Sequence, residues 1–464
     1  MHPADRISML PPTLLLLLNA ALSVAQTRQT LPIGYVVSEK LAPNPPFFTI
    51  PTASQLAISV AMCSGTTDAA LPRFFVTNSS SDASPGSSGG DNVFEIVLNQ
   101  GHGNWTGTFP SGGVLGVEDA GQIPFEIGVS SGIPIHEWVP SPPLVGDTTA
   151  TQALLFSPPF APQTPQDPAY PNYALPDANL TIPSPPSNPT NYTLVLLPTS
   201  ASLATMPQTA CMLLAQKSSG TIVNQTLWPR DASGWRMEYR VTGLTAKTNY
   251  TMYVVENTYK VGGPIFFTTK SSTFSCPLVS RLPYCPSIGY AVPLPPPPAA
   301  QAMYDSTNLP ESITTPLLSS LTNFTTTLST FACGRDFYSP LVSCADCQRA
   351  YRTWLCTISF PRCGDADTAP AAAALLTSQS PNARNAAFPP GNSYTQLLPC
   401  IETCTAADRA CPNFLKFRCP LPRFNAAQSY GVGFIDSGED GVVGQGSTGT
   451  WADNYGNVWC TSGQ

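Results

Sequence analysis

The stretch that decides the fold of the C-terminal third reads Ala332-Cys-Gly-Arg-Asp-Phe-Tyr-Ser-Pro340, then Cys344-Ala-Asp-Cys-Gln-Arg-Ala-Tyr-Arg-Thr-Trp-Leu-Cys356, and then Ile358-Ser-Phe-Pro-Arg-Cys363. Cys344 and Cys347 are three residues apart, and Trp354 continues the same face of a helix. The spacing therefore predicts a helix whose cysteines, together with Trp354, face a small common core. Upstream, apolar residues recur at helical spacing from Leu317 to Phe331 and predict an amphipathic helix that leads into this region.

Ten of the 14 cysteines fall in this part of the chain: Cys333, Cys344, Cys347, Cys356, Cys363, Cys400, Cys404, Cys411, Cys419 and Cys460. Five bridges among them would replace much of the apolar burial that so small a module lacks. Spacing does not determine the connectivity. We also expect Cys276 and Cys285 to be disulfide-bonded. For Cys63 and Cys211, one in each β region, two interpretations stay open: a disulfide between the regions, or two buried free thiols.

The pair Cys344 and Cys347 also fits the spacing of a zinc site or a redox-active CxxC motif. Zinc needs unpaired thiolates or histidines, and no histidine occurs in the cysteine-rich region. A redox motif is typical of a thioredoxin-like βαβ context, which the sequence does not show. We therefore interpret these cysteines as structural disulfides and expect no metal and no cofactor.

The first residues indicate the compartment. Arg6 precedes an apolar run that begins at Leu14, and Ser23 and Ala25 are small residues before a cleavage site, so residues 1–25 read as a signal peptide. An uncleaved anchor is the alternative. We find no later apolar run of spanning length and no hydrophobic C-terminal tail, so we expect the mature chain to be soluble or to be held at a membrane by a partner.

Seven Asn-x-Ser/Thr sequons favour a surface that carries glycans. They are Asn78, Asn104, Asn179, Asn191, Asn224, Asn249 and Asn323. Only 11% of the residues are charged and the net charge is −7, which excludes a nucleic-acid partner recruited by bulk charge.

Composition divides the chain into a mainly β N-terminal half and a small helical, disulfide-rich domain. The predicted segments are a β-sandwich-like domain at 26–156, a Pro-rich linker or extended wrap at 157–189, a second β domain at 190–273, a Pro-rich linker at 274–311, and a helix with the cysteine-rich domain at 312–464. The second β domain resembles a fibronectin type III domain in its last strands, with Leu244 and Tyr250 at the corner positions.

We expect no enzymatic activity. Gly128-Val-Ser130-Ser-Gly132 matches the G-x-S-x-G pattern, but a hydrolase of that type has its acid and histidine much further along the chain. His136 is the last histidine in the sequence and lies only six residues after Ser130.

The cysteine motifs quoted above resemble the C-terminal module of the fungal stretch-activated calcium-channel component, the family named for death during the mating-pheromone response. The resemblance is strongest over 333–363 and extends more weakly to 460. The module also resembles a Frizzled-type cysteine-rich domain and a module in an auxiliary subunit of animal sodium-leak channels.

The resemblance implies a function in fungal calcium entry, activated by stretch or stress, together with a large four-repeat pore subunit. The family name suggests a channel, yet a pore through lipid needs membrane-spanning segments, and we find none after the signal. We therefore expect an auxiliary subunit on the extracellular face of the plasma membrane and in the endoplasmic reticulum lumen. The alternative is a free secreted module that binds a lipid or a glycan.

The predicted partner surface lies around the first helix of the module. It comprises Arg335, Phe337, Tyr338, Arg349 and Arg352, because arginine and aromatic residues dominate interface energetics. Nine Lys and Arg against six Asp and Glu between Cys333 and Arg423 make this region basic in an otherwise acidic chain. Acidic loops above a cation-selective pore would complement it. Packing or solvation of the module by the same residues is the alternative.

Overall fold

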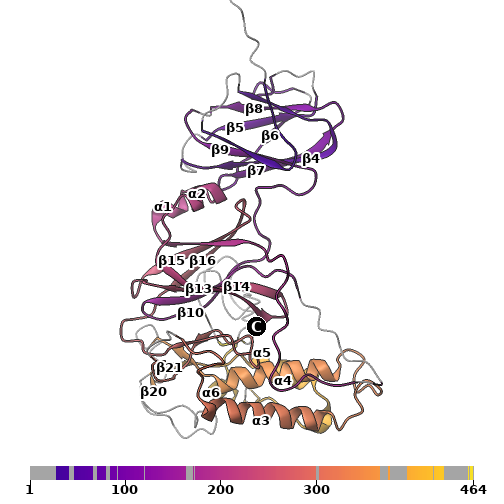
Figure 1. Cartoon of the computed structure of the whole chain (residues 1–464), viewed down its shortest axis with the longest axis vertical. Coiled ribbons are helices and arrows are strands. Elements are labelled where there is room, and N and C mark those ends of the chain that lie inside the picture. The colour runs from indigo at the N-terminus through magenta and orange to yellow at the C-terminus, as the bar shows by residue number, and fades with distance from the viewer. Residues whose placement is uncertain are drawn as a thin grey trace, which may run out of the picture.

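The computed structural model places a β-sandwich at one end of a long axis, a second sandwich in the middle and a helical module at the other end (Figure 1). It describes residues 28–40, 46–65, 71–79, 84–90, 92–119, 121–162, 171, 173–298, 303–365, 375–376, 394–421, 423–432, 458 and 460–462. The expected signal peptide, residues 1–25, lies outside the described residues. In the described parts of the chain, no helix is both long and apolar enough to cross a bilayer.

The first sandwich packs two sheets face to face, as its alternating sequence predicts. One sheet has the order β1 (Gln29–Thr30), β3 (Phe47–Ile50), β8 (Gly113–Glu118), β5 (Arg73–Thr77), β6 (Val93–Ile96). The other has the order β2 (Tyr35–Glu39), β9 (Phe125–Ser130), β4 (Ala53–Met62), β7 (His102–Phe109). Alternation along β4 sends Ile58, Val60 and Met62 into the core, while Ser59 points to the outer face.

The second sandwich has seven strands. One sheet runs β10 (Leu144–Thr148), β11 (Gln152–Phe156), β14 (Gly234–Thr242), β13 (Thr221–Asp231), and the other runs β12 (Tyr192–Pro198), β15 (Asn249–Glu256), β16 (Lys260–Thr268). Two short helices, α1 (Ala201–Ala204) and α2 (Ala210–Leu214), connect β12 to β13. This strand order is that of an immunoglobulin constant-type sandwich. The expected corner is present, because the Tyr250 hydroxyl accepts the Thr245 N–H at 3.0 Å while Leu244 lies in the core.

Two predicted boundaries differ from the structure. The sequence places residues up to 156 in the first domain, but β10 and β11 complete the second sandwich, because β11 pairs along its length with β14. The stretch 157–189 therefore connects β11 to β12 and is no linker between domains. Residues 274–311 were expected as a second linker, but the described parts, 274–298 and 303–311, are packed. They contain β17 (Leu278–Val279) and β18 (Tyr290–Ala291), and Leu282, Tyr284 and Ile288 are buried against the helices.

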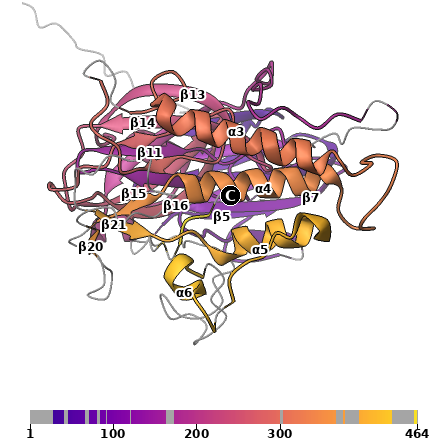
Figure 2. The same ribbon diagram turned by 90° about the horizontal axis from the view of Figure 1, so that it is seen from below.

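The helical module contains α3 (Glu311–Leu328), α4 (Cys344–Ser359), α5 (Ile401–Ala410), a 3-10 turn (Asn413–Leu415), α6 (Ala426–Ser429) and a small sheet of β19 (Arg362–Gly364), β21 (Tyr394–Leu397) and β20 (Leu375–Leu376). Helix α4 lies between α3 and α5 beneath the second sandwich (Figure 2). The expected apolar stripe of α3 is buried through Leu317, Leu321 and Leu328. Ser343 and Asp346 form a capping box that begins α4.

Candidate functional site

All 14 cysteines are paired in seven disulfides, and none is free. Four bridges lie within the cysteine-rich region: Cys333–Cys344, Cys347–Cys411, Cys400–Cys460 and Cys404–Cys419. Two fasten it to the preceding packed segment, Cys276–Cys363 and Cys285–Cys356, and the seventh, Cys63–Cys211, joins the two sandwiches. The expected set of five internal bridges is therefore wrong, because the end of α4 and β19 face the segment 274–294 rather than the rest of the module.

The CxxC pair is divided between two bridges. Cys344 bonds Cys333 in the loop before α4, and Cys347 bonds Cys411 at the end of α5. The shared helical face predicted from their spacing is present, and each sulfur on it reaches a different neighbour. This arrangement favours the structural interpretation over a redox-active pair.

The loop between α3 and α4 presents the most exposed apolar side chains of the described module. Phe337 is 85% exposed and Leu341 is 89% exposed. Arg335 is also exposed and is ion-paired with its neighbour Asp336 at 2.7 Å. Sequence reasoning found Arg335 and Phe337 by residue type, but it missed Leu341, which carries no periodic signal.

Tyr338 anchors that loop to the rest of the module. Its hydroxyl lies 2.7 Å from the carbonyl oxygens of Ser343 and Ala410, and burial raises its pKa to about 12. Its ring packs edge-on against Phe331, which also stacks on Phe414. Tyr338 therefore positions the exposed tip beside the end of α5, and it is itself half-buried.

Arg349 and Arg352 differ in their surroundings, although both were expected at the partner surface. Arg349 is exposed and ion-paired with Asp346. Arg352 is buried, and its guanidinium donates to the carbonyl oxygens of Ala178, Asp177 and Tyr284 at 2.5, 2.8 and 3.1 Å. The prediction for Arg352 is corrected: it faces the Pro-rich stretch, and burial lowers its pKa to about 10.

The part of that stretch around residues 173–178, here called the strap, runs along α4. The Gln348 side chain donates to the Pro176 carbonyl at 2.7 Å, and Tyr173 and Leu175 pack against the module. The expected extended wrap therefore lies on the helices. Trp354, interpreted as core, is half-buried and donates to the Tyr430 hydroxyl at 2.9 Å.

A buried ion cluster fastens the second sandwich to the module. Asp147 accepts hydrogen bonds from Arg362 at 2.9 Å and Lys270 at 2.8 Å. Burial alone would raise the pKa of Asp147, but the two cations hold it well below its usual range. No sequence pattern links these residues, because they come from three distant elements.

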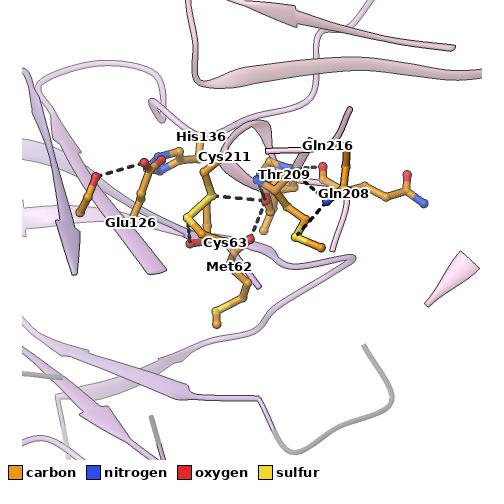
Figure 3. Close-up of a disulfide and its surroundings, with 12 residues drawn as sticks. Met62, Cys63, Glu126, His136, Gln208, Thr209, Cys211 and Gln216 are labelled. Carbon is orange, nitrogen blue, oxygen red and sulfur yellow. Dashed lines mark hydrogen bonds and ion pairs between the residues drawn. A yellow bond between two sulfur atoms is a disulfide. The ribbon is translucent and has the colours of Figure 1, made fainter. Parts of the chain in front are cut away.

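The two sandwiches meet at a second fastening, shown in Figure 3. Beside the Cys63–Cys211 bridge, the Thr209 hydroxyl donates to the Met62 carbonyl at 2.5 Å. Of the two interpretations left open for Cys63 and Cys211, the disulfide between the β regions is therefore the one that the structure has. On the other side of the junction, backbone hydrogen bonds join Val139 and Glu137 to Val261 of β16.

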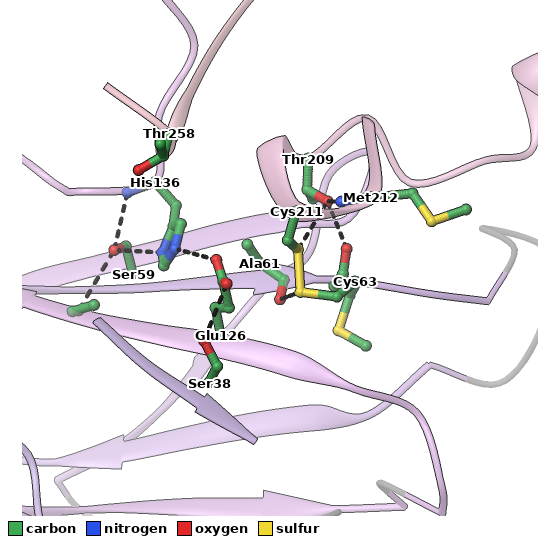
Figure 4. Close-up of polar contacts among 12 residues, drawn as sticks. Ser38, Ser59, Ala61, Cys63, Glu126, His136, Thr209, Cys211, Met212 and Thr258 are labelled. Atoms are coloured by element: carbon green, nitrogen blue, oxygen red, sulfur yellow. Dashed lines mark hydrogen bonds and ion pairs between the residues drawn. A yellow bond between two sulfur atoms is a disulfide. The ribbon is translucent and has the colours of Figure 1, made fainter. Parts of the chain in front are cut away.

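Ser59, His136 and Glu126 form a polar chain at this junction (Figure 4). His136 Nδ1 lies 3.1 Å from the Ser59 hydroxyl, and its Nε2 lies 3.3 Å from a Glu126 oxygen. Ser59 and His136 are closed to solvent, so this group of side chains fastens the segment after β9 to the outer face of the first sandwich and offers no nucleophile open to substrate. The Ser130 hydroxyl of the G-x-S-x-G match donates to the Ile133 carbonyl instead.

The predicted glycosylation asparagines lie on the surface. Five of the seven are exposed and two, Asn78 and Asn224, are half-buried. The exposed ones are Asn104, Asn179, Asn191, Asn249 and Asn323. None of the seven lies in the loop that carries Phe337 and Leu341.

Two β-sandwiches, joined to each other and to a cysteine-rich helical module by disulfides and buried polar contacts, define a disulfide-rich multidomain protein. The chain belongs to the Mid1 family of stretch-activated Ca2+-permeable channel components, whose sequence model matches residues 51–445.

Three relatives carry channel names. The chain is 31% identical to the stretch-activated cation channel MID1 of Cryptococcus neoformans, over 93% of this chain and 84% of that protein. It is 31% identical to the protein of the same name in Saccharomyces cerevisiae over 39% of this chain and 35% of the relative. The stretch-activated cation channel yam8 of Schizosaccharomyces pombe is 31% identical over 42% and 40% respectively.

Proposed function

We propose that this protein is an extracellular auxiliary subunit of a fungal plasma-membrane calcium channel, and that it supports calcium influx by binding a large four-repeat pore subunit. Membership in a family of channel components supports a role in calcium entry. Seven disulfides and surface sequons favour maturation in the secretory pathway and work on its extracellular side.

The observation that carries the proposal is the exposed tip of the cysteine-rich module. Phe337 and Leu341 place two large apolar side chains in solvent on a loop fixed by the Cys333–Cys344 bridge and by Tyr338. A rigid apolar tip loses little conformational freedom when a partner covers it, so its burial contributes more to affinity. Arg335 beside it and Arg349 on α4 add exposed guanidinium groups, which can exchange their neighbouring carboxylates, Asp336 and Asp346, for the acidic loops of a cation channel.

Purification of the native complex tests the role. Affinity capture of the wild-type chain from detergent-solubilised fungal membranes is expected to recover a large four-repeat channel protein. The double variant Phe337→Asp/Leu341→Asp is expected to lose at least about tenfold of that recovery, because interface anchors commonly contribute more than 1 kcal/mol each. Stretch-evoked calcium influx should fall with it.

A matched control is Val97→Asp/Ile133→Asp, which places two charges at exposed apolar positions of the first sandwich, where Val97 is 76% and Ile133 is 66% exposed. This control should retain the channel protein. Normal secretion and an unchanged non-reducing gel pattern show that both variants fold. If the Phe337→Asp/Leu341→Asp variant recovers the channel protein at the wild-type level, the contact with the pore subunit lies elsewhere on the chain. Failure of the wild-type chain to recover any channel protein would favour the free lipid- or glycan-binding module.

A further inference from the structure

The bridge between the sandwiches is the one disulfide of the seven in which neither cysteine is buried. Both Cys63 and Cys211 are half-buried, whereas every other bridge contains at least one buried cysteine. Loss of this bridge leaves β4 and α2 joined by other contacts, because the Thr209 hydroxyl donates to the Met62 carbonyl and the Gln208 N–H donates to the Gln100 carbonyl. A small thiol can therefore reach this bridge while the fold around it persists.

A third potential ligand lies beside the two sulfurs. The alternation of β4 and β9 places Glu126 on the same outer face as Cys63, and a carboxylate oxygen of Glu126 lies within 4.8 Å of both sulfurs. Figure 4 shows the Glu126 side chain between the His136 ring and the bridge. The Ser38 hydroxyl at 3.1 Å and His136 Nε2 at 3.3 Å hold the two carboxylate oxygens, which is how proteins orient a metal-binding carboxylate.

The geometry points to a zinc site that forms when Cys63–Cys211 is reduced, with the two thiolates and Glu126 as ligands and the exposed side open to water. Two thiolates bound to tetrahedral zinc stand about 3.8 Å apart, given a Zn–S distance of about 2.3 Å. Side-chain rotation supplies that separation, since the two Cα atoms are 5.2 Å apart. The metal then links β4 to α2 where the disulfide linked them before.

The chemistry balances with a low-molecular-weight thiol as reductant. Two such thiols transfer two electrons and two protons to the bridge, forming Cys63-SH and Cys211-SH and leaving one small-molecule disulfide. Binding of Zn2+ then displaces the two thiol protons into solvent. A second group of similar composition, Cys400, Glu402 and Cys460, does not fit, because its two cysteines are 2% and 0% exposed and a small thiol cannot reach their bridge.

Graded reduction of the purified full-length protein tests the site without any pore subunit, so its outcome is independent of the proposed channel role. Reduced glutathione, alkylation and peptide mass spectrometry should show Cys63 and Cys211 labelled before the other twelve cysteines. Zn2+ added before alkylation should protect both, and one zinc per chain should survive gel filtration. Co2+ in place of zinc should show thiolate charge-transfer absorption.

Variants assign the ligands. Glu126→Gln keeps both thiols and should weaken zinc binding by at least about tenfold. Glu137→Gln, at the same junction but ion-paired to Lys260, is the matched control and should bind as wild type does. Earlier opening of another bridge, no retained zinc in the reduced protein, or wild-type zinc retention by either Glu126→Gln or Cys63→Ser/Cys211→Ser would each overturn the site.

Discussion

Asp147 and Arg362 form an ion pair that closes the boundary between the second sandwich and the cysteine-rich module, although 215 residues separate them in the chain. Their side chains are 4% and 7% exposed, and Nε of Arg362 lies 2.9 Å from the carboxylate. The Cys276–Cys363 disulfide ends at the neighbouring residue. The ion pair therefore holds the short strand β19 against the sandwich, and the disulfide fastens the same strand to the packed segment 274–294.

Breaking this pair should destabilise the protein strongly. Arg362→Met leaves Asp147 buried with Lys270 as its remaining cation, and loss of one partner of a buried pair costs about 3–5 kcal/mol. Arg73→Met, in the exposed Arg73–Glu95 pair, should change the stability far less, because solvent screens an exposed ion pair. Urea unfolding followed by tryptophan fluorescence measures both variants. Equal costs would show that the buried pair contributes no more than a surface pair.

His102 should make the protein acid-sensitive. Its pKa is lowered to about 4, mainly by burial and to a smaller extent by the nearby His136. The hydrogen bond between its Nε2 and the Gln208 carbonyl acts in the opposite direction. An unfolded histidine binds a proton near pH 6.5 and the folded one near pH 4, so the unfolded state gains stability as the pH falls between these values.

Once the pH is below both pKa values, His102 lowers the free energy of unfolding by about 3 kcal/mol, because one pKa unit corresponds to about 1.4 kcal/mol. The free energy of unfolding of wild type and His102→Gln, measured from pH 7.5 to 4, should therefore differ in slope over this window. Parallel curves would mean that the folded protein takes up a proton at His102 as readily as the unfolded chain does.

Arg352 should matter for stability and Arg349 should not. Arg352→Met leaves the Asp177, Ala178 and Tyr284 carbonyls without their donor and should cost about 3 kcal/mol, because each bond involves a charged group. It should also expose the strap to limited proteolysis. Arg349→Met is the control, with an expected change within about 0.5 kcal/mol. An uncut strap in the Arg352 variant would show that packing alone holds it.

The stability lost when a disulfide is removed should increase with the length of the loop that the bridge closes. Cys276–Cys363 closes a separation of 87 residues and Cys333–Cys344 one of 11. The chain-entropy relation gives about 4–5 kcal/mol for the first bridge and about 3 kcal/mol for the second. Paired Cys→Ala variants compared by denaturant midpoint and secretion level check the order. A larger effect of the short bridge would indicate that it contributes through positioning of the Phe337 loop.

Local patterns predicted much of the module and little of its attachments. The helical spacing of Cys344, Cys347 and Trp354 was sufficient to predict α4, and Tyr250 was sufficient to predict the corner of the second sandwich. Both signals depend on near neighbours in the sequence. Leu341 was missed because exposure of a loop residue leaves no pattern. The prediction for Arg352 was wrong because its position in the helix predicts only that its side chain points away from the cysteine face. It does not predict which segment of the chain covers the side of α4 that carries Arg352.

The sequence by itself determined the family, the β-then-helical order and the disulfide-rich character of the C-terminal region. These depend on motif spacing and composition, which are properties of short segments. Only the tertiary structure decided that β11 pairs with β14, that the strap and residues 278–294 are packed rather than free, and that Cys63 bonds Cys211. Each of these contacts joins segments far apart in the chain, and their energy comes from burial and pairing that exist only once both segments are folded.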